Sequence, residues 1–218
     1  MTVKPFIAFF DLDHTLLDTS SGRLFIKYAY QQGMISHGEL ISGMLIAAIH
    51  RFGMFNTSNI FQKWAQKFAG WPETKMRDFT ERFFIERVAS RFRPQIVDEV
   101  RFHKARGAHT VLLSASTSYI CEPARRHLSM DAVLSTTLEV ENGIFTGRTR
   151  GRYCYGAEKL VRAAAYCRSM DIALSECYYY GDSFADLPVL EKIGFPVCVH
   201  PDRALRRIAL QRGWRTIP

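Results

Sequence analysis

The sequence has no long hydrophobic run. Beyond the N-terminal strand-like segment, its longest apolar stretch covers residues 44–49, far shorter than the roughly 20 apolar residues that a membrane-spanning helix requires. The N-terminal segment MTVKPFIAFF contains a lysine and an early proline and leads directly into charged residues, unlike a secretory signal peptide. We therefore expect a cytoplasmic protein without stable membrane insertion.

Paired cysteine motifs are also missing. The five cysteines are odd in number and none of them forms a CxxC pair. A disulfide framework normally needs an even set, and zinc sites normally need closely spaced pairs. The pattern excludes both as the basis of the fold and predicts reduced thiols.

Negative charge is in the minority. The chain has 29 Lys and Arg against 21 Asp and Glu, a formal net charge of +8. This excess favours anionic partners such as phosphate esters, nucleic acids or an acidic membrane surface. The most basic stretch, residues 87–106, is interrupted by Asp98 and Glu99 and carries no nucleic-acid-binding motif. We read it as an exposed helix face and expect no nucleic-acid partner.

Strand signals are absent from residues 23–92. Apolar side chains recur there at helical spacing, as in Phe61, Trp64 and Phe68, and Ser36 with Glu39 forms a capping-box pattern. Within this block the segment ELISGMLIAAIHRFGMF is unusually apolar. It predicts a buried helix, with a dimer interface or a contact with a lipid-like substrate as alternatives.

The remainder of the chain alternates strands with helices. A hairpin is indicated around Asn142-Gly143, and further strands are indicated at residues 6–10, 110–113, 177–180 and 195–199. Alternation of this kind implies a mostly parallel sheet covered by helices. We predict an α/β protein with a Rossmann-like core of residues 1–18 and 93–218 and an inserted all-helical cap of residues 19–92.

Polar side chains stand where the predicted strands end. Asp11 and Asp13 follow the first strand, Ser114 follows the second and Asp182 follows a later one. Parallel sheets bind ligands beyond the carboxyl ends of their strands. Carboxylates there suit Mg²⁺, and a carboxylate can also attack phosphorus. Taken singly, each aspartate could equally be a turn residue.

The same residues carry a family resemblance. DLDHT at 11–15, SAS at 114–116, Lys159 in GAEKL and GDSFAD at 181–186 resemble, in order, the four motifs of the haloacid dehalogenase-like hydrolases. The match is to the branch of phosphoserine phosphatases and related small-molecule phosphatases. It implies a Mg²⁺-dependent phosphatase of small phosphorylated metabolites.

The resemblance implies a role for each aspartate of the first motif. Asp11 would be the nucleophile that forms an aspartyl-phosphate. Asp13 would protonate the leaving alkoxide and then help to activate water. Mg²⁺ would be held by the carboxylates of Asp11 and Asp182 and by the backbone carbonyl of Asp13.

The other motifs imply residues that hold the phosphoryl group. Ser114, Lys159 and the backbone N–H near Ala115 would bind phosphate oxygens. Asp186 would orient Lys159 or a metal-bound water. A phosphotransferase using the same intermediate and a non-catalytic module that binds a phosphorylated ligand remain alternatives.

Two positions depart from the phosphoserine phosphatases. The segment DTSSGR, which follows the first motif, lacks their amine-binding Glu, and Ser183 and Ala185 replace a Gly and an Asn of the fourth motif. Arg23 is a candidate for binding an anionic group of the substrate. The resemblance points to an amino-acid or amino-alcohol phosphate such as phosphoserine or histidinol phosphate. The oligomeric state, monomer or homodimer, stays open.

Overall fold

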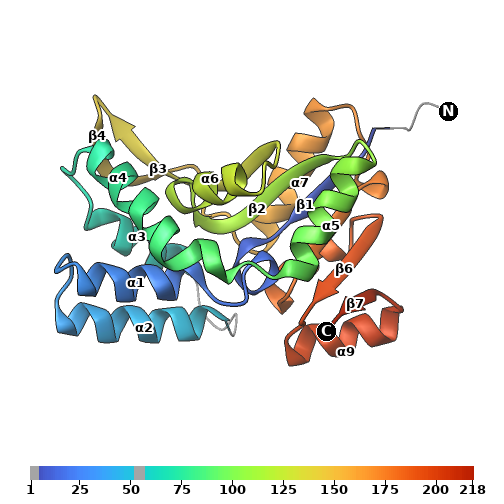
Figure 1. Cartoon of the computed structure of the whole chain (residues 1–218), viewed down its shortest axis with the longest axis horizontal. Helices are drawn as coiled ribbons and strands as arrows, with labels where there is room; N and C mark the ends of the chain where they lie inside the picture. Colours follow the sequence, from blue (N-terminus) through green and yellow to red (C-terminus); the bar gives the residue numbers. More distant parts are fainter. Residues whose placement is uncertain (1–4, 52–56) are drawn as a thin grey trace.

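The computed structural model describes residues 5–51 and 57–218. Within them the strands form one seven-stranded sheet in the order β4-β3-β2-β1-β5-β6-β7 (Figure 1). The strands are β1 (Ile7–Phe10), β2 (His109–Thr117), β3 (Ala132–Glu141), β4 (Ile144–Arg150), β5 (Tyr178–Gly181), β6 (Phe195–Val199) and β7 (Arg215–Ile217). The predicted α/β fold with a mostly parallel sheet is confirmed.

Strand β1 lies at the centre of this sheet. It pairs in parallel with β2, where Phe9 faces Val111, and with β5, where Phe9 faces Tyr179. From β1 the chain builds outward through β2 and β3, and it later returns to β5 on the opposite side. The strand order therefore reverses between β1 and β5, which is where open α/β sheets bind ligands.

Both faces of the sheet are covered by helices. Alternate residues of β1 point to opposite faces, so Phe10 joins one hydrophobic cluster and Phe9 joins another. The helices that follow the insert are α5 (Pro94–Ala105), α6 (Ser118–His127), α7 (Ala157–Ser169), α8 (Leu187–Leu190) and α9 (Arg203–Arg212). All of the cysteines are buried free thiols, as their spacing predicted.

The insert between β1 and β2 is helical in its described part. It contains α1 (Ser21–Gln31), α2 (His37–Arg51), α3 (Thr57–Gln66) and α4 (Glu73–Phe83), which lie together at one end of the molecule (Figure 1). The Ser20 hydroxyl accepts a hydrogen bond from the backbone N–H of Arg23 at the start of α1. The predicted capping box of Ser36 and Glu39 is present.

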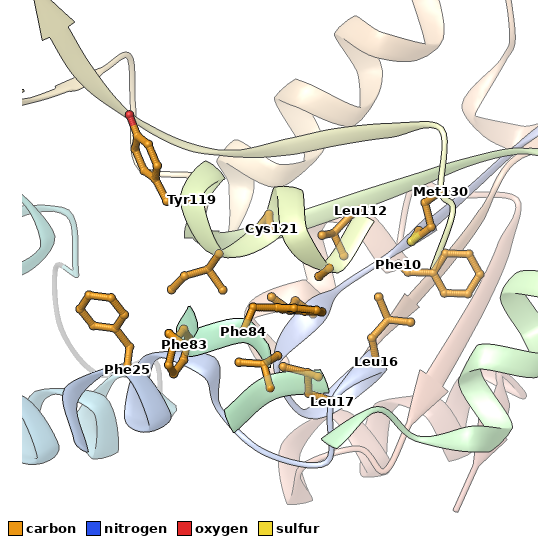
Figure 2. Close-up of a cluster of buried hydrophobic side chains, with 14 of the residues drawn as sticks. Phe10, Leu16, Leu17, Phe25, Phe83, Phe84, Leu112, Tyr119, Cys121 and Met130 are labelled. Carbon is orange, nitrogen blue, oxygen red and sulfur yellow. The ribbon is translucent and has the colours of Figure 1, made fainter. Parts of the chain in front are cut away.

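A shared hydrophobic cluster joins this helical block to the sheet. Figure 2 shows Phe25 and Phe83 of the block in one cluster of buried side chains with Cys121 of α6 and Leu112 of β2. The rings of Phe25 and Phe83 meet edge to face, with centroids 5.5 Å apart, a favourable aromatic geometry. All four side chains are buried, so the block and the sheet bury apolar surface together.

Strand β3 is longer than the sequence indicated. Its first half pairs in parallel with β2, and its second half pairs antiparallel with β4. The β3–β4 turn is Asn142-Gly143, both with positive φ, as predicted. β4 then reaches the helical block, because Phe145 exchanges backbone hydrogen bonds of 2.9 Å with Gly70 and Trp71. The hairpin thus ties the C-terminal half of the chain to the insert.

Helix α2 differs from the prediction of a buried apolar helix. Its Ile41 and Leu45 side chains are each 60% exposed, because this face of α2 points away from the rest of the block. The side chains of residues 46–60 lie outside the described part of the chain. Among the described helices, none has the length and apolar character needed to cross a membrane.

Candidate active site

The first site residues lie at the carboxyl end of β1. The backbone N–H of Asp11 donates to the Tyr180 carbonyl at 2.9 Å, which fixes Asp11 beside β5. The chain then enters the irregular turn η1 (Leu12–Leu16), in which His14 takes a positive φ. Asp13 accepts a 2.8 Å hydrogen bond from the backbone N–H of Ser21, the first residue of α1. The helical block therefore starts in direct contact with the site.

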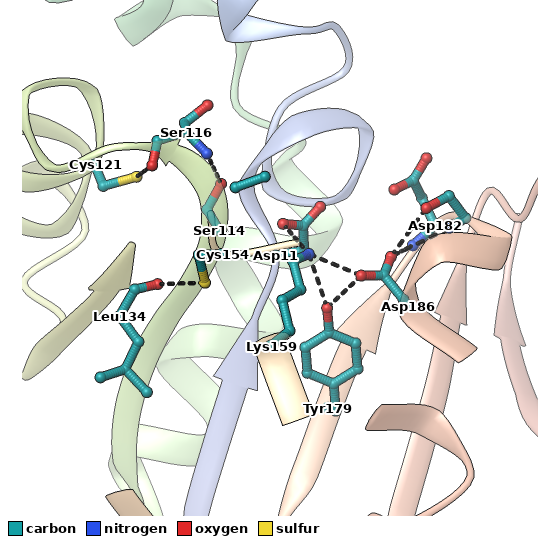
Figure 3. A network of polar contacts seen from close by, with 12 residues as sticks. Asp11, Ser114, Ser116, Cys121, Leu134, Cys154, Lys159, Tyr179, Asp182 and Asp186 are labelled. Atoms are coloured by element: carbon teal, nitrogen blue, oxygen red, sulfur yellow. Dashed lines mark hydrogen bonds and ion pairs between the residues drawn. The ribbon is translucent and has the colours of Figure 1, made fainter. Parts of the chain in front are cut away.

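Lys159 is the centre of the buried polar network in Figure 3. Its Nζ lies 2.8 Å from Asp11 Oδ1, 2.7 Å from Asp186 Oδ1 and 3.1 Å from the Tyr179 hydroxyl. Burial lowers the pKa of Lys159, but the Asp11 and Asp186 carboxylates outweigh it and raise the pKa well above its ordinary value. The two carboxylates therefore favour the charged form of the Lys159 amine.

Asp186 uses both carboxylate oxygens to hold its neighbours. Oδ1 accepts from Lys159 and, at 2.6 Å, from the Tyr179 hydroxyl. Oδ2 accepts from the backbone N–H groups of Asp182 and Ser183. Burial raises the pKa of Asp186, but Lys159 and these hydrogen bonds bring it below its ordinary value. A carboxylate with this many donors is well placed to fix Lys159.

Tyr179 was not identified from the sequence, and Gly181 was identified only as part of the fourth motif. They are two residues apart on β5 and so share one face of the sheet. A Cβ at Gly181 would lie 2.8 Å from Asp186 Oδ2 and 2.8 Å from a ring carbon of Tyr179. The sequence signal for this contact is Gly181 itself, because a glycine inside a strand often marks a place where other side chains approach the backbone closely.

Ser114 and Ala115 lie at the irregular end of β2. The register between β2 and β3 shifts between Ser114 and Thr117. The Ser114 hydroxyl accepts from the backbone N–H of Ser116 at 3.2 Å, and the Ala115 carbonyl accepts from the Thr136 hydroxyl at 2.9 Å. These contacts hold the irregular end of β2 against its own backbone and against β3.

The predicted motif residues meet in one small cavity of about 80 Å³. The lining shared with the prediction is Asp11, Asp13, Ser114, Ala115, Lys159, Asp182 and Asp186. The lining that the prediction missed is His14, Ser20, Tyr155, Ser183 and Ala185. Among the described residues, Arg23 is outside this lining; its side chain is half-buried on α1.

Three carboxylates in this cavity suit a divalent cation. Oxygens of Asp11, Asp182 and Asp186 all lie within 4.8 Å of one another, and all three residues are buried. Burial raises the pKa of Asp11 to about 7, although Lys159 opposes it. Burial likewise raises the pKa of Asp13, against the hydrogen bond from Ser21. Oxygen donors of this kind are the ligands that Mg²⁺ prefers.

These features define a hydrolase site of a known kind. A family model for haloacid dehalogenase-like hydrolases matches residues 8–191, which is most of the chain. The chain therefore belongs to this family. The relatives described next include proteins that are named as phosphatases.

Curated relatives cover nearly the whole chain. A Streptomyces azureus protein named for inhibition of morphological differentiation is 34% identical, covering 95% of this chain and 76% of that protein. A probable phosphatase of Mycobacterium tuberculosis is 31% identical, covering 95% and 73%. A histidinol-phosphatase of Neisseria meningitidis serogroup C is 24% identical, covering 95% and 96%.

Solved structures share the fold. A protein of unknown function from Bordetella pertussis Tohama I superposes with a TM-score of 0.90 at 27% identity and covers 99% of both chains. A substrate-bound phosphoserine phosphatase has a TM-score of 0.73 at 17% identity, covering 98% of this chain and 93% of that one. At the latter identity the likeness shows the fold alone.

Proposed function

We propose that the protein is a Mg²⁺-dependent phosphomonoester hydrolase that acts on a small phosphorylated metabolite through a phospho-Asp11 intermediate. The observation that carries this proposal is the buried cluster in which Asp11 lies 2.8 Å from Lys159 and shares one cavity with Asp13, Ser114 and Asp182. A nucleophile, an acid, a fixed cation and phosphate-binding groups are thus within reach of one small anion.

Asp11 is the nucleophile in this mechanism. Its carboxylate attacks phosphorus and forms a P–O bond, while the bond from phosphorus to the substrate's alcohol oxygen breaks. Asp13 gives its proton to that departing oxygen. The raised pKa of Asp13 supports this role, since a general acid must carry its proton at working pH. In the second half, Asp13 takes a proton from the water that attacks phosphorus, the P–O bond to Asp11 breaks, and inorganic phosphate leaves with Asp11 restored as a carboxylate.

The carboxylates of Asp11 and Asp182, with the Asp13 carbonyl, would hold Mg²⁺. When bound, the cation offsets the repulsion between Asp11 and the phosphate and stabilises charge on the transferring group. Asp186 belongs to the same carboxylate cluster, but its oxygens already accept from Lys159, Tyr179 and two backbone N–H groups. Asp186 is therefore assigned to positioning Lys159.

Lys159, the Ser114 hydroxyl and the backbone N–H of Ala115 bind the phosphoryl oxygens in this proposal. Donors fixed before the reaction stabilise developing charge without reorganisation. Ser114 is 2% exposed and Lys159 is 4% exposed, so both act out of contact with bulk water. This low-dielectric setting strengthens their attraction for phosphate.

The helical block of residues 19–92 acts as the cap in this proposal and closes over the site to exclude water. The contact between Asp13 and Ser21 supports a coupling of the block to the acid. The names of the relatives favour an amino-acid or amino-alcohol phosphate, such as phosphoserine or histidinol phosphate. A phosphotransferase would share the chemistry as far as phospho-Asp11; alkyl phosphate formed from an added alcohol would reveal it.

The test is an Asp11→Asn variant assayed for phosphate release from a panel of phosphorylated metabolites with Mg²⁺. Because Asn is a poor nucleophile of the same size, we expect turnover to fall by at least about 10³-fold. The matched control is Asp98→Asn, whose side chain is 69% exposed and which should keep full activity. Unchanged release by the Asp11 variant would refute the mechanism.

A further inference from the structure

A second, larger cavity adjoins the catalytic one. Its volume is about 580 Å³, against about 80 Å³ for the catalytic cavity, and small-molecule sites typically span roughly 300–1,000 Å³. It is lined by Phe61, Gln62, Thr149, Gly151, Arg152, Tyr153, Tyr155, Ala157, Glu158 and Val161. Tyr155 lines both cavities. The catalytic cavity has room for a phosphoryl group, and the larger one has room for what the phosphoryl group is attached to.

A row of aromatic rings leads from the larger cavity to the catalytic one. The rings of Phe61 and Tyr153 stack with centroids 4.6 Å apart and planes 20° apart. Tyr153 and Tyr155 stack at 5.9 Å and 15°. Burial raises the pKa of Tyr153, and the Asp13 carboxylate adds to this rise. The carboxylate of Asp13, the proposed acid, therefore interacts electrostatically with Tyr153, the middle ring of the row.

Several polar groups of the lining already have hydrogen-bond or ion-pair partners within the protein. The Gln62 amide donates to the Gly147 carbonyl at 3.1 Å, and the Thr149 hydroxyl donates to the Gly151 carbonyl at 3.0 Å. Glu158 is paired with Arg162 at 3.3 Å. These groups are therefore less available to a small polar alcohol, whereas the rings offer a surface for a flat apolar group. The remaining charged residue of the lining, Arg152, is exposed.

Residues from the start of α7 line both cavities. Ala157, Glu158 and Val161 face the larger cavity, while Lys159 points into the catalytic one. A molecule in the larger cavity would therefore contact Glu158, the residue next to the phosphate-binding Lys159 in the sequence.

We propose that the larger cavity binds the alcohol part of the substrate and selects phosphate esters of alcohols that carry a flat, unsaturated ring over esters of small aliphatic alcohols. This inference rests on the proposed phosphatase function, because it names the substrate class of that site. Phe61 and Tyr153 bind the ring, and neither takes part in the chemistry.

The experiment compares benzyl phosphate with ethyl phosphate. Both release an alkyl alcohol, so the ring is the main difference between them. We expect wild-type kcat/KM to be at least about tenfold higher for benzyl phosphate. Phe61→Ala and Tyr153→Leu should raise KM for benzyl phosphate about 5- to 10-fold with little change in kcat, the signature of lost uniform binding, and should leave ethyl phosphate within twofold.

Two controls separate ring binding from folding. Tyr153→Phe keeps the ring and should behave like wild type. Phe102→Ala removes a phenyl ring that is 52% exposed on α5 and should change neither substrate. Equal kcat/KM for the two esters in wild type, or variants that leave their ratio unchanged, overturns the inference while the phosphatase function stands.

A binding measurement covers the case in which the phosphatase function itself fails. Benzylphosphonate and ethylphosphonate, which cannot be hydrolysed at phosphorus, are titrated by calorimetry into wild-type protein and Phe61→Ala. At least about tenfold tighter binding of benzylphosphonate, lost in the variant, supports the ring site without any turnover. Equal affinities overturn it.

Discussion

The two sides of α7 use charge in opposite ways. On one side Lys159 meets Asp11 and Asp186, with side chains 5%, 8% and 1% exposed. On the other side the adjacent residue Glu158 pairs with Arg162, at 18% and 20% exposure, and lines the larger cavity. The start of α7 therefore carries a buried ionic network on one side and a partly exposed ion pair on the other.

The two sides should differ in the loss of stability that follows when one charged residue is removed. Removing a member of a sealed network leaves another charge without water or a counter-ion, which is strongly unfavourable. A pair that water reaches is screened, and its loss is small. We infer that the catalytic side of α7 tolerates few substitutions, whereas the cavity side can vary with substrate.

The largest effect is expected for the substitution Lys159→Met on the catalytic side of α7. Met fills a similar volume but leaves Asp11 and Asp186 facing each other without a cation. In the absence of metal we expect the free energy of unfolding to drop by about 3–5 kcal/mol, measured by urea denaturation. Phosphate release should fall by at least about 10³-fold, since a phosphate-binding charge is lost.

The control for this variant is Lys192→Met, which removes an exposed lysine. It should change stability by less than about 0.5 kcal/mol and leave activity intact. A Lys159 variant as stable as this control would mean that the buried network contributes no more than a surface charge.

A second prediction concerns the cation. Binding of Mg²⁺ to the folded state alone raises the unfolding temperature as its concentration rises. In Asp182→Asn we expect the Mg²⁺ concentration at which this rise begins to increase at least about tenfold, because a buried carboxylate ligand becomes neutral. Differential scanning calorimetry over a Mg²⁺ series measures the shift without reference to activity.

EDTA treatment should bring wild type and Asp182→Asn to the same unfolding profile in this assay if the carboxylate acts mainly through the metal. Asp98→Asn should follow wild type throughout the series. If the rise begins at the same Mg²⁺ concentration in Asp182→Asn as in wild type, Asp182 is not a ligand of the cation.

The sequence was informative where side chains follow directly from strand ends. Asp11, Ser114 and Asp182 could be placed together because the carboxyl ends of parallel strands share one edge, and the structure brings them into one cavity. Tyr155 and Phe61 could not be placed in this way. Their positions depend on a loop after β4 and on the packing of α3, which no local pattern encodes.

Long-range pairing explains the other differences. The first half of β3, from Ala132, lacks a clear strand pattern of its own and gains its conformation from pairing with β2. The contact of β4 with Gly70 and Trp71 joins segments far apart in the chain. Exposure of Ile41 likewise follows from how α2 packs, whereas its helical spacing was visible in the sequence.

The smallest expected effect is on the outer side of α7. Glu158→Gln keeps the size of the side chain and removes its charge from the pair with Arg162. We expect a loss of less than about 1 kcal/mol in the free energy of unfolding, and the loss should shrink as salt is added. Phosphate release should stay within about twofold of wild type, although Glu158 adjoins Lys159. A loss of stability near that of Lys159→Met would show that the two sides of the helix are energetically alike. It would also show that water does not screen an ion pair whose side chains are 18–20% exposed.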